Sequence, residues 1–158
     1  MKYIQANSSE HKLMHEQAQT ALKIIAKINS KYHEPKELNK LFSKLICKNV
    51  DESFVLFPPF YTDCGKNITI GKNVFINSGC KFQDQGGIFI GNNVLIGHNV
   101  VIATINHEQE PKNRANMILK SVVIEDDVWK CNHTSRRKSR QRLYNSCWFG
   151  CNKRCRRV

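Results

Sequence analysis

Residues 70–102 read IGKNVFINSGCKFQDQGGIFIGNNVLIGHNVVI, and apolar side chains return in them every six residues. Ile70, Ile76 and Phe82 have this spacing, and it begins again at Ile90. Each hexad adds a small residue, two polar turn-formers and a second small or branched apolar residue. Regular self-similarity of this kind is typical of stacked repeats. The spacing therefore predicts one short strand and one turn per hexad.

Three such strands close a triangular coil of 18 residues, with the aliphatic side chains on its axis and Gly or Asn in its turns. We interpret Gly86-Gly87 as a two-residue slip between registers. A β-sandwich, the ordinary alternative, would show an alternation of two and turns every 8 to 12 residues. Residues 53–129 are therefore predicted to form a parallel β-helix.

The segment before the repeats has a different period. From Glu10 to Cys47, apolar residues recur at helical spacing in two runs, and Glu34-Pro35 separates the runs. Proline ends one helix and is tolerated at the start of the next. Two helices of this size cannot bury their apolar faces alone. Residues 1–52 are therefore predicted to form a small helical cap that docks on the β-helix.

The hexad pattern stops at Ile102 and resumes at Ile124 in VVIEDDVW. Residues 104–121 fall outside the repeat, so we expect an extruded loop. Long insertions in a regular scaffold usually carry function. This loop is the first place to look for catalytic side chains.

Four motifs follow one another in the repeat region: FPPFYTDCGKNITIG, VFINSGCKFQDQGG, IGHNVVIATINH and VVIEDDVW. In this order they resemble the galactoside and maltose O-acetyltransferases, over residues 10–129. The resemblance implies a mainly β fold, a left-handed parallel β-helix of hexapeptide repeats with a small N-terminal helical cap. It also implies acetyl-CoA as co-substrate, no metal, a sugar or similar small acceptor, and a homotrimer with active sites between neighbouring subunits.

The resemblance assigns roles residue by residue. His107 in ATINHEQEPKNR matches the family's catalytic histidine, and imidazole, with a pKa near ~6.5, can accept a hydroxyl proton at neutral pH. Asn77 and Asp84 fall where the family contacts the acceptor's hydroxyls, and Arg114 is a further candidate for that role. Trp129 falls where the family lines the acetyl-CoA groove. Turn formation is the alternative role for Asn77 and Asp84, and an exposed loop position is the alternative for His107.

The charge of the chain is concentrated at its C-terminal end. The net charge is +12, yet residues 1–129 carry 15 Lys/Arg against 13 Asp/Glu, while residues 130–158 carry 10 Lys/Arg and no acid. The cysteines of this tail contain no CxxC pair, so a zinc site is not predicted. A basic arm that binds RNA is a further alternative, since aromatic residues accompany the arginines.

A shifted reading frame explains the tail better. After Trp129 the family's pattern would continue with Ile-Gly and two more coils. If each shifted codon takes the last two bases of one tail codon and the first base of the next, permitted codons from Lys130 to Cys155 can spell NAIILPGVKVGKDCIIAAGSVVTKDV, which keeps the six-residue spacing. We therefore predict that residues 130–158 are a non-native, frameshifted tail.

The sequence shows no signal peptide and no apolar stretch near the roughly 18 residues of a membrane span. We therefore expect a cytoplasmic protein with neither a membrane nor a nucleic-acid partner. The expected function is an acetyl-CoA-dependent O-acetyltransferase, impaired by loss of its C-terminal coils. One alternative is an inactive remnant with an open, unpaired end. The least favoured is a nucleic-acid-binding protein that uses the tail.

Overall fold

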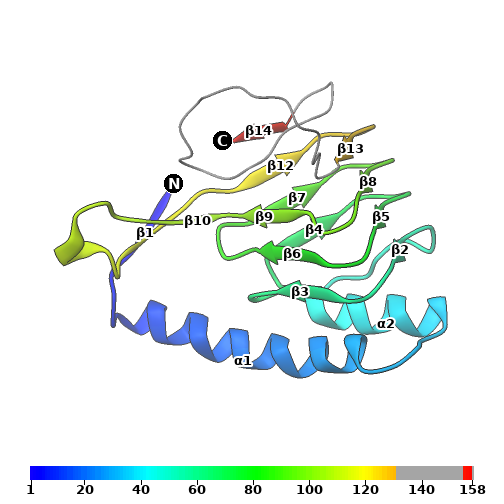
Figure 1. The fold of residues 1–158 in the computed structure, drawn as a ribbon, viewed down its shortest axis with the longest axis horizontal. Helices are drawn as coiled ribbons and strands as arrows, with labels where there is room; N and C mark the ends of the chain where they lie inside the picture. Colours follow the sequence, from blue (N-terminus) through cyan, green and yellow to red (C-terminus); the bar gives the residue numbers. More distant parts are fainter. Residues whose placement is uncertain (131–154, 158) are drawn as a thin grey trace.

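The computed structural model describes residues 1–130 and 155–157. The predicted frameshift therefore concerns a tail that lies almost wholly outside the described residues. Three parallel sheets form the body of the molecule, and two helices lie against one end of it (Figure 1). We call these sheets the first, second and third, in chain order.

Each sheet stacks strands from successive coils. The first sheet contains β2 (Val55–Leu56), β5 (Phe75–Ile76), β8 (Leu95–Ile96) and β13 (Trp129–Lys130). The second contains β3 (Phe60–Thr62), β6 (Cys80–Gln83) and β9 (Val101–Ala103). The third contains β4 (Ile68–Ile70), β7 (Ile88–Ile90) and β12 (Val122–Ile124), and β14 (Cys155–Arg157) pairs antiparallel with β12.

The coils are longer than the 18 residues expected. Strand partners before the extruded loop differ by 20 residues in every sheet, as in Phe75 with Leu95, Phe60 with Cys80 and Ile68 with Ile88. The two extra residues lie at the corner between the second and third sheets. The slip proposed for Gly86-Gly87 is therefore a feature of each coil before the loop, because residues 63–67 take the same course one coil earlier.

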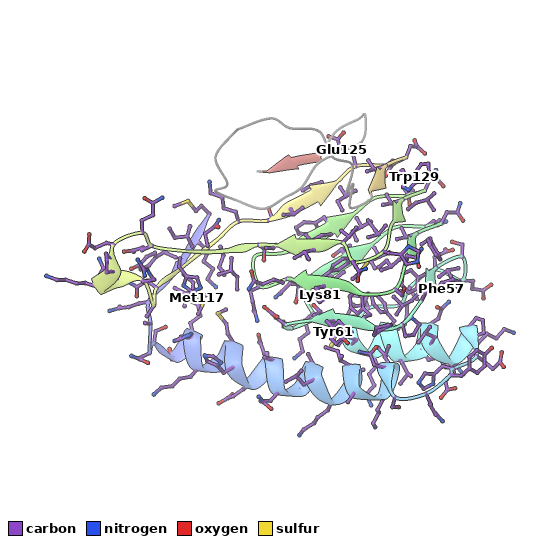
Figure 2. The ribbon with its side chains drawn as sticks, viewed as in Figure 1. Phe57, Tyr61, Lys81, Met117, Glu125 and Trp129 are labelled. Atoms are coloured by element: carbon purple, nitrogen blue, oxygen red, sulfur yellow. The ribbon has the colours of Figure 1, made fainter. Side chains whose placement is uncertain are left out.

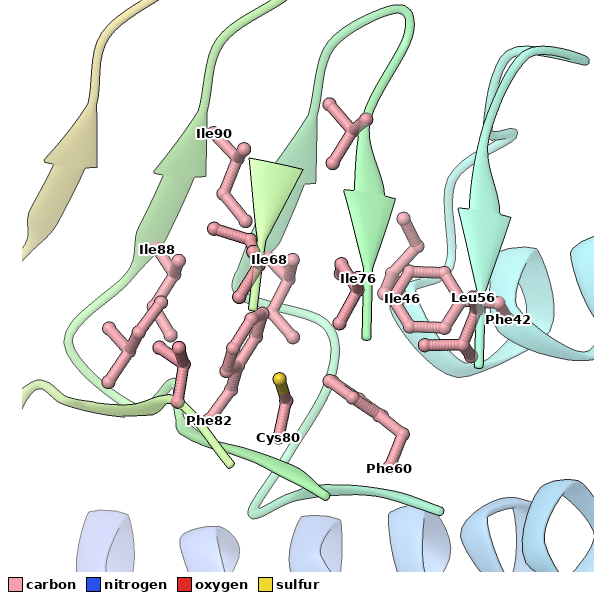
Figure 3. Packing of buried hydrophobic residues seen from close by; sticks show 14 of the residues in the cluster. Phe42, Ile46, Leu56, Phe60, Ile68, Ile76, Cys80, Phe82, Ile88 and Ile90 are labelled. Carbon is pink, nitrogen blue, oxygen red and sulfur yellow. The ribbon is translucent and has the colours of Figure 1, made fainter. Parts of the chain in front are cut away.

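The axis of the coil is filled by the apolar residue of each hexad. Ile76, Ile88, Ile96 and Ile102 have no exposed surface, and Phe82 is almost completely buried (Figure 3). Phe42 comes from the cap and stands 4.7 Å from Phe54 and 5.3 Å from Phe60, ring centre to ring centre. Each fully buried side chain of this kind contributes about 1.5–3 kcal/mol.

The cap consists of α1 (Ser9–Asn29) and α2 (Pro35–Ile46). Ser8 begins α1, and its hydroxyl oxygen accepts a hydrogen bond from the His11 amide at 3.2 Å. Pro35 stands in the first turn of α2, where its missing N–H costs nothing. Cys47 ends α2 in a left-handed conformation. The helix break expected at Glu34-Pro35 is thus confirmed.

Polar side chains of the cap form hydrogen bonds with main-chain groups along the outer edge of the first coil. Asn29 donates to the Phe60 oxygen and accepts from the Phe60 amide, both at 2.9 Å. Asn39 donates to the Phe54 oxygen, just before β2, at 3.1 Å. The Lys48 ammonium donates to the Ile68 oxygen in β4 at 2.8 Å. Side chains thus take the place of a further coil at this end.

The hexad turns are held by ladders of Asn and Asp side chains. Asn73, Asn93 and Asp127 have positive φ values of 53°, 56° and 60°, which Asn and Asp tolerate better than other side chains. Asn73 donates to Asn93, and Asn93 donates to Asp127, each at 3.0 Å. Each turn is therefore bonded to the equivalent turn of the next coil.

Candidate active site

The extruded segment is an antiparallel hairpin. It consists of β10 (Ile105–His107), a tip with a short 3₁₀ helix at Pro111–Asn113, and β11 (Met117–Leu119). Thr104 anchors its root: the Thr104 hydroxyl donates to the Gln83 oxygen at 2.5 Å and accepts from the Gly86 amide at 2.8 Å. The hairpin therefore leaves the body at a fixed point, beside the corner between the second and third sheets.

His107 is the last residue of β10, and its side chain is exposed. Its Nδ1 lies 2.9 Å from the main-chain oxygen of Arg114, in the tip of the same hairpin. A carbonyl oxygen only accepts hydrogen bonds, so Nδ1 carries the proton and donates. The neutral ring then has its lone pair at Nε2, which can accept a proton from an acceptor hydroxyl.

Arg114 follows the 3₁₀ helix directly, and its side chain is exposed. Its described contact with the site is made by its carbonyl and not by its guanidinium. Arg114 and His107 are therefore brought together. The predicted acceptor contact of the Arg114 side chain stays a prediction.

Asp84 is fully buried in the corner beneath the root of the hairpin. One carboxylate oxygen accepts from the Thr62 hydroxyl at 2.7 Å and from the Cys64 amide at 2.8 Å, and the other accepts from the Asn67 amide at 3.2 Å. These contacts join one coil to the next. Such contacts are what the turn-forming alternative expects, and acceptor binding by Asp84 stays a prediction.

Asp63 lies half-buried in the same corner, beside Asp84. Burial raises the pKa of the Asp63 carboxyl above its usual range, the charge of Asp84 raises it further, and a hydrogen bond with Gln83 opposes both effects. Asp63 was not predicted from the sequence. The feature that would have identified it is the 20-residue offset between coils, which places Asp63 directly below Gln83 and next to Asp84.

Asn77 and Trp129 belong to the other end of the coil. Asn77 directly follows β5, is half-buried, and accepts a hydrogen bond from the Ser78 amide at 2.9 Å. Trp129 lies in β13, opposite Leu95, with 63% of its surface exposed. Outward-facing Val55 and Phe75 continue the same row, which we call the apolar ladder.

The five predicted residues do not meet in one chain. The hairpin with His107 and Arg114 leaves the end of β9, whereas Asn77 precedes the start of β6, at the opposite end of the second sheet. Figure 2 shows the same separation, with Met117 of the hairpin at one side and Trp129 and Phe57 at the other. The candidate residues therefore lie in two groups on opposite sides of the same coil.

A groove of about 970 Å³ follows α2, lined by several lysines and by Cys47, Asn49 and Val50. None of the five candidate residues lines it. Within the described residues, no group of three or more His, Cys, Asp or Glu side chains is arranged to bind a metal ion. In the same part of the chain, neither helix is both long enough and apolar enough to cross a membrane.

No protein-family model matches the chain. Galactoside O-acetyltransferase of Lactococcus lactis is 34% identical to it over 125 residues, which are 77% of this chain and 59% of that protein. The chain thus spans about three fifths of this relative's length.

Two solved structures are similar in fold and sequence. A hexapeptide-repeat acetyltransferase from Vibrio cholerae superposes with a TM-score of 0.67 at 30% identity, over 79% of this chain and 69% of the other; a second structure of it contains acetyl-CoA. A maltose O-acetyltransferase from Clostridium difficile superposes with a TM-score of 0.72 at 27% identity, over 81% and 68%. The chain belongs to the hexapeptide-repeat acetyltransferases. Its relatives include the galactoside and maltose O-acetyltransferases that its motifs resemble.

Proposed function

We propose that this protein is an acetyl-CoA-dependent O-acetyltransferase, with a sugar or a similar small hydroxyl compound as acceptor. The observation that carries the proposal is the bond from His107 Nδ1 to the Arg114 oxygen, which leaves Nε2 as the basic atom. The acceptor hydroxyl loses its proton to Nε2 while its oxygen attacks the thioester carbonyl. The C–S bond then breaks, and the proton passes from Nε2 to the leaving thiolate.

The other candidate residues have roles in binding. Asn77 offers an amide that can both donate to and accept from sugar hydroxyls. The Arg114 guanidinium and Asp84 remain candidates for the same acceptor, although Asp84 also has the buried contacts described above. Trp129, exposed on the apolar ladder, offers a broad surface for the coenzyme. The acetyl-CoA found in the Vibrio cholerae structure supports this choice of co-substrate.

We further propose that the active site is completed by a second copy of the chain, in a homotrimer of left-handed coils. The separation of the two groups of candidate residues supports this. The apolar ladder also supports it, because outward-facing Val55, Leu95 and Trp129 are 42%, 45% and 63% exposed in the isolated chain. In such a trimer, the hairpin of one copy would bring His107 to the Asn77 and Trp129 of its neighbour. We place the protein in the cytoplasm, which the exposed thiol of Cys47 supports.

An inactive remnant is the second candidate. The described coils end at β13, and the shifted-frame text would supply the coils that follow in longer relatives. Those coils would also supply an amide that stabilises the oxyanion, and such a donor contributes roughly 10²–10³ in rate.

The test is acetyl-CoA turnover by the purified chain with a panel of sugars, beside a version that carries the alternative frame after Trp129. His107→Ala is expected to lower kcat/KM about 10²–10⁴-fold, through loss of the general base. His98→Ala, at an exposed histidine of a hexad turn, is the matched control. If only the restored version transfers acetyl groups, the result supports the second candidate, in which the present chain is an inactive remnant. Activity in neither version makes the enzymatic proposal wrong.

A further inference from the structure

The first residues of the chain form a strand that joins the hairpin. β1 (Lys2–Ile4) pairs antiparallel with β11, and the resulting sheet has the order β1-β11-β10. β11 therefore lies between the N-terminal strand and the strand that carries His107 (Figure 1). Only 3% of Ile4 is exposed. The chain then turns over residues 5–8 before α1 begins.

Three consecutive amides of this turn each donate to a different acceptor. The Ala6 amide donates to the Asn116 side chain of the hairpin at 2.9 Å, and the Ser8 amide donates to a main-chain oxygen of the same turn at 3.3 Å. Between them, the Asn7 amide donates to Nδ1 of His11 at 2.9 Å. Asn7 has a φ of 63°, a left-handed conformation that needs such support. Of the three acceptors, His11 is the one that titrates near neutral pH.

The bond from Asn7 fixes the tautomer of His11. A main-chain N–H only donates, so Nδ1 of His11 carries no proton, and the neutral ring has its proton on Nε2. This Nε2 lies 3.2 Å from Nε2 of His15, one turn later in α1, so His11 donates and His15 accepts. A further proton on Nδ1 of His11 or on Nε2 of His15 would set two N–H groups against each other.

The charges near the pair do not favour such a proton. His11 lies in the first turn of α1, where the end of the helix dipole is positive. In the part of the chain that the structure describes, neither imidazole has a carboxylate partner, because Glu10 pairs with Lys2 of β1. The other charged side chains on the adjoining parts of α1 and the hairpin are Lys12, Glu16, Glu108, Glu110, Lys112 and Arg114.

We propose that the His11–His15 pair is a pH-sensitive lock on the N-terminal strand. It holds the turn between β1 and α1 while both rings are neutral, and it releases the turn when either ring gains a proton. The folded turn binds fewer protons than the released one, so its stability is present at high pH and is lost as the pH falls. The hairpin that carries His107 then loses its third strand. The lock does not depend on the proposed function.

The experiment uses the full 158-residue chain, labelled with ¹⁵N. At about pH 8, the imidazole nitrogen shifts of His11 should show a proton on Nε2 and none on Nδ1. Amide hydrogen exchange is measured at about pH 8 and about pH 5.5, both above the range in which exposed carboxylates ordinarily gain a proton. After correction for the intrinsic effect of pH, we expect the protection of residues 2–4 to fall about 5–10-fold, as for the loss of one capping bond. The amides of β5 and β8 should keep their protection.

Two variants make this outcome specific. His11→Gln keeps an oxygen that accepts from the Asn7 amide but does not titrate, so the protection of residues 2–4 should be alike at both pH values. His98→Gln makes the same change at an exposed histidine of a hexad turn, and the fall should remain as in the parent. His107 is present in every version, and a proton added to its Nε2 leaves its bond to the Arg114 oxygen intact.

Four results would each overturn the proposal: a parent without the fall, a His11→Gln variant with an equal fall, a His98→Gln variant without it, or a proton on Nδ1 of His11 at the higher pH. Protected amides in β5 and β8 show that each variant is folded, so a change confined to residues 2–4 is local to the turn.

Discussion

Among single residues, His107 and Asp84 show what a motif match can predict and what requires a structure. The motif located both, and the structure gives each a surrounding that suggests its role. His107 is exposed and oriented by one carbonyl, whereas Asp84 is buried and accepts three hydrogen bonds. The sequence could not separate these roles, because Asp is common both in turns and in sugar-binding sites.

Substitution of Asp84 should therefore affect stability. Asp84→Ala leaves three donors without an acceptor, and we expect the free energy of unfolding to fall by about 3 kcal/mol or more. Asp84→Asn keeps one oxygen and should cost roughly half as much. Denaturant titration measures both. If Asp84→Asn instead left stability normal and raised the KM for the acceptor, the binding role would be established.

Asp63 should make the protein less stable as the pH rises. Its pKa in the folded state is raised above the ordinary value of 3.8, so between these two values the folded chain binds more protons than the unfolded chain. Stability then falls as the pH rises through this window. We expect Asp63→Asn to raise Tm by a few degrees at about pH 7 and to leave it unchanged below the window. A constant difference in Tm across the window and below it would contradict this origin.

At the scale of elements, the periodicity of the sequence predicted the helices and the repeated strands, but it did not predict the short strands outside the repeat. The two helices begin and end within a few residues of the predicted limits, because their apolar positions recur over several turns. β1, β10 and β11 have three residues each, too few for an alternation to be visible. The length of the coil was wrong by two residues, because the corner residues carry polar turn chemistry rather than the apolar signal of a hexad.

The turn ladders offer a test at this scale. Asn93→Ala removes two side-chain hydrogen bonds and puts a residue that tolerates the left-handed region less well than Asn in this turn, so we expect a loss of about 1–2 kcal/mol. Asn93→Gly relieves only the backbone strain and should recover part of this loss. Asn113→Ala, at an exposed position in the hairpin tip, is the control. Equal stability of the Ala and Gly variants would assign the whole effect to the lost hydrogen bonds.

For the whole molecule, the apolar ladder is the feature that a single chain leaves unexplained. Leu95→Glu puts a charge in its middle, at a side chain that is 45% exposed, so the isolated fold should be little affected. If the proposed trimer forms through this ladder, Leu95→Glu should dissociate it, as measured by analytical ultracentrifugation. Val101→Glu is the matched control, because Val101 is 46% exposed on the second sheet. Dissociation by Val101→Glu alone would place the interface on the second sheet.

One edge of the first coil is closed by the side chains of Asn29, Asn39 and Lys48. Further coils can therefore stack only on the opposite edge. Exposed strand edges are where foreign strands add, and these three residues occupy groups at that end that a foreign strand would need. Two of them belong to the cap helices and the third follows directly, so all leave the ribosome before the coils they protect. Each later coil then pairs with the folded strands of the preceding coil on one side and faces solvent on the other. A change in the reading frame late in the gene thus alters only the last layers of the stack and leaves the first ones complete.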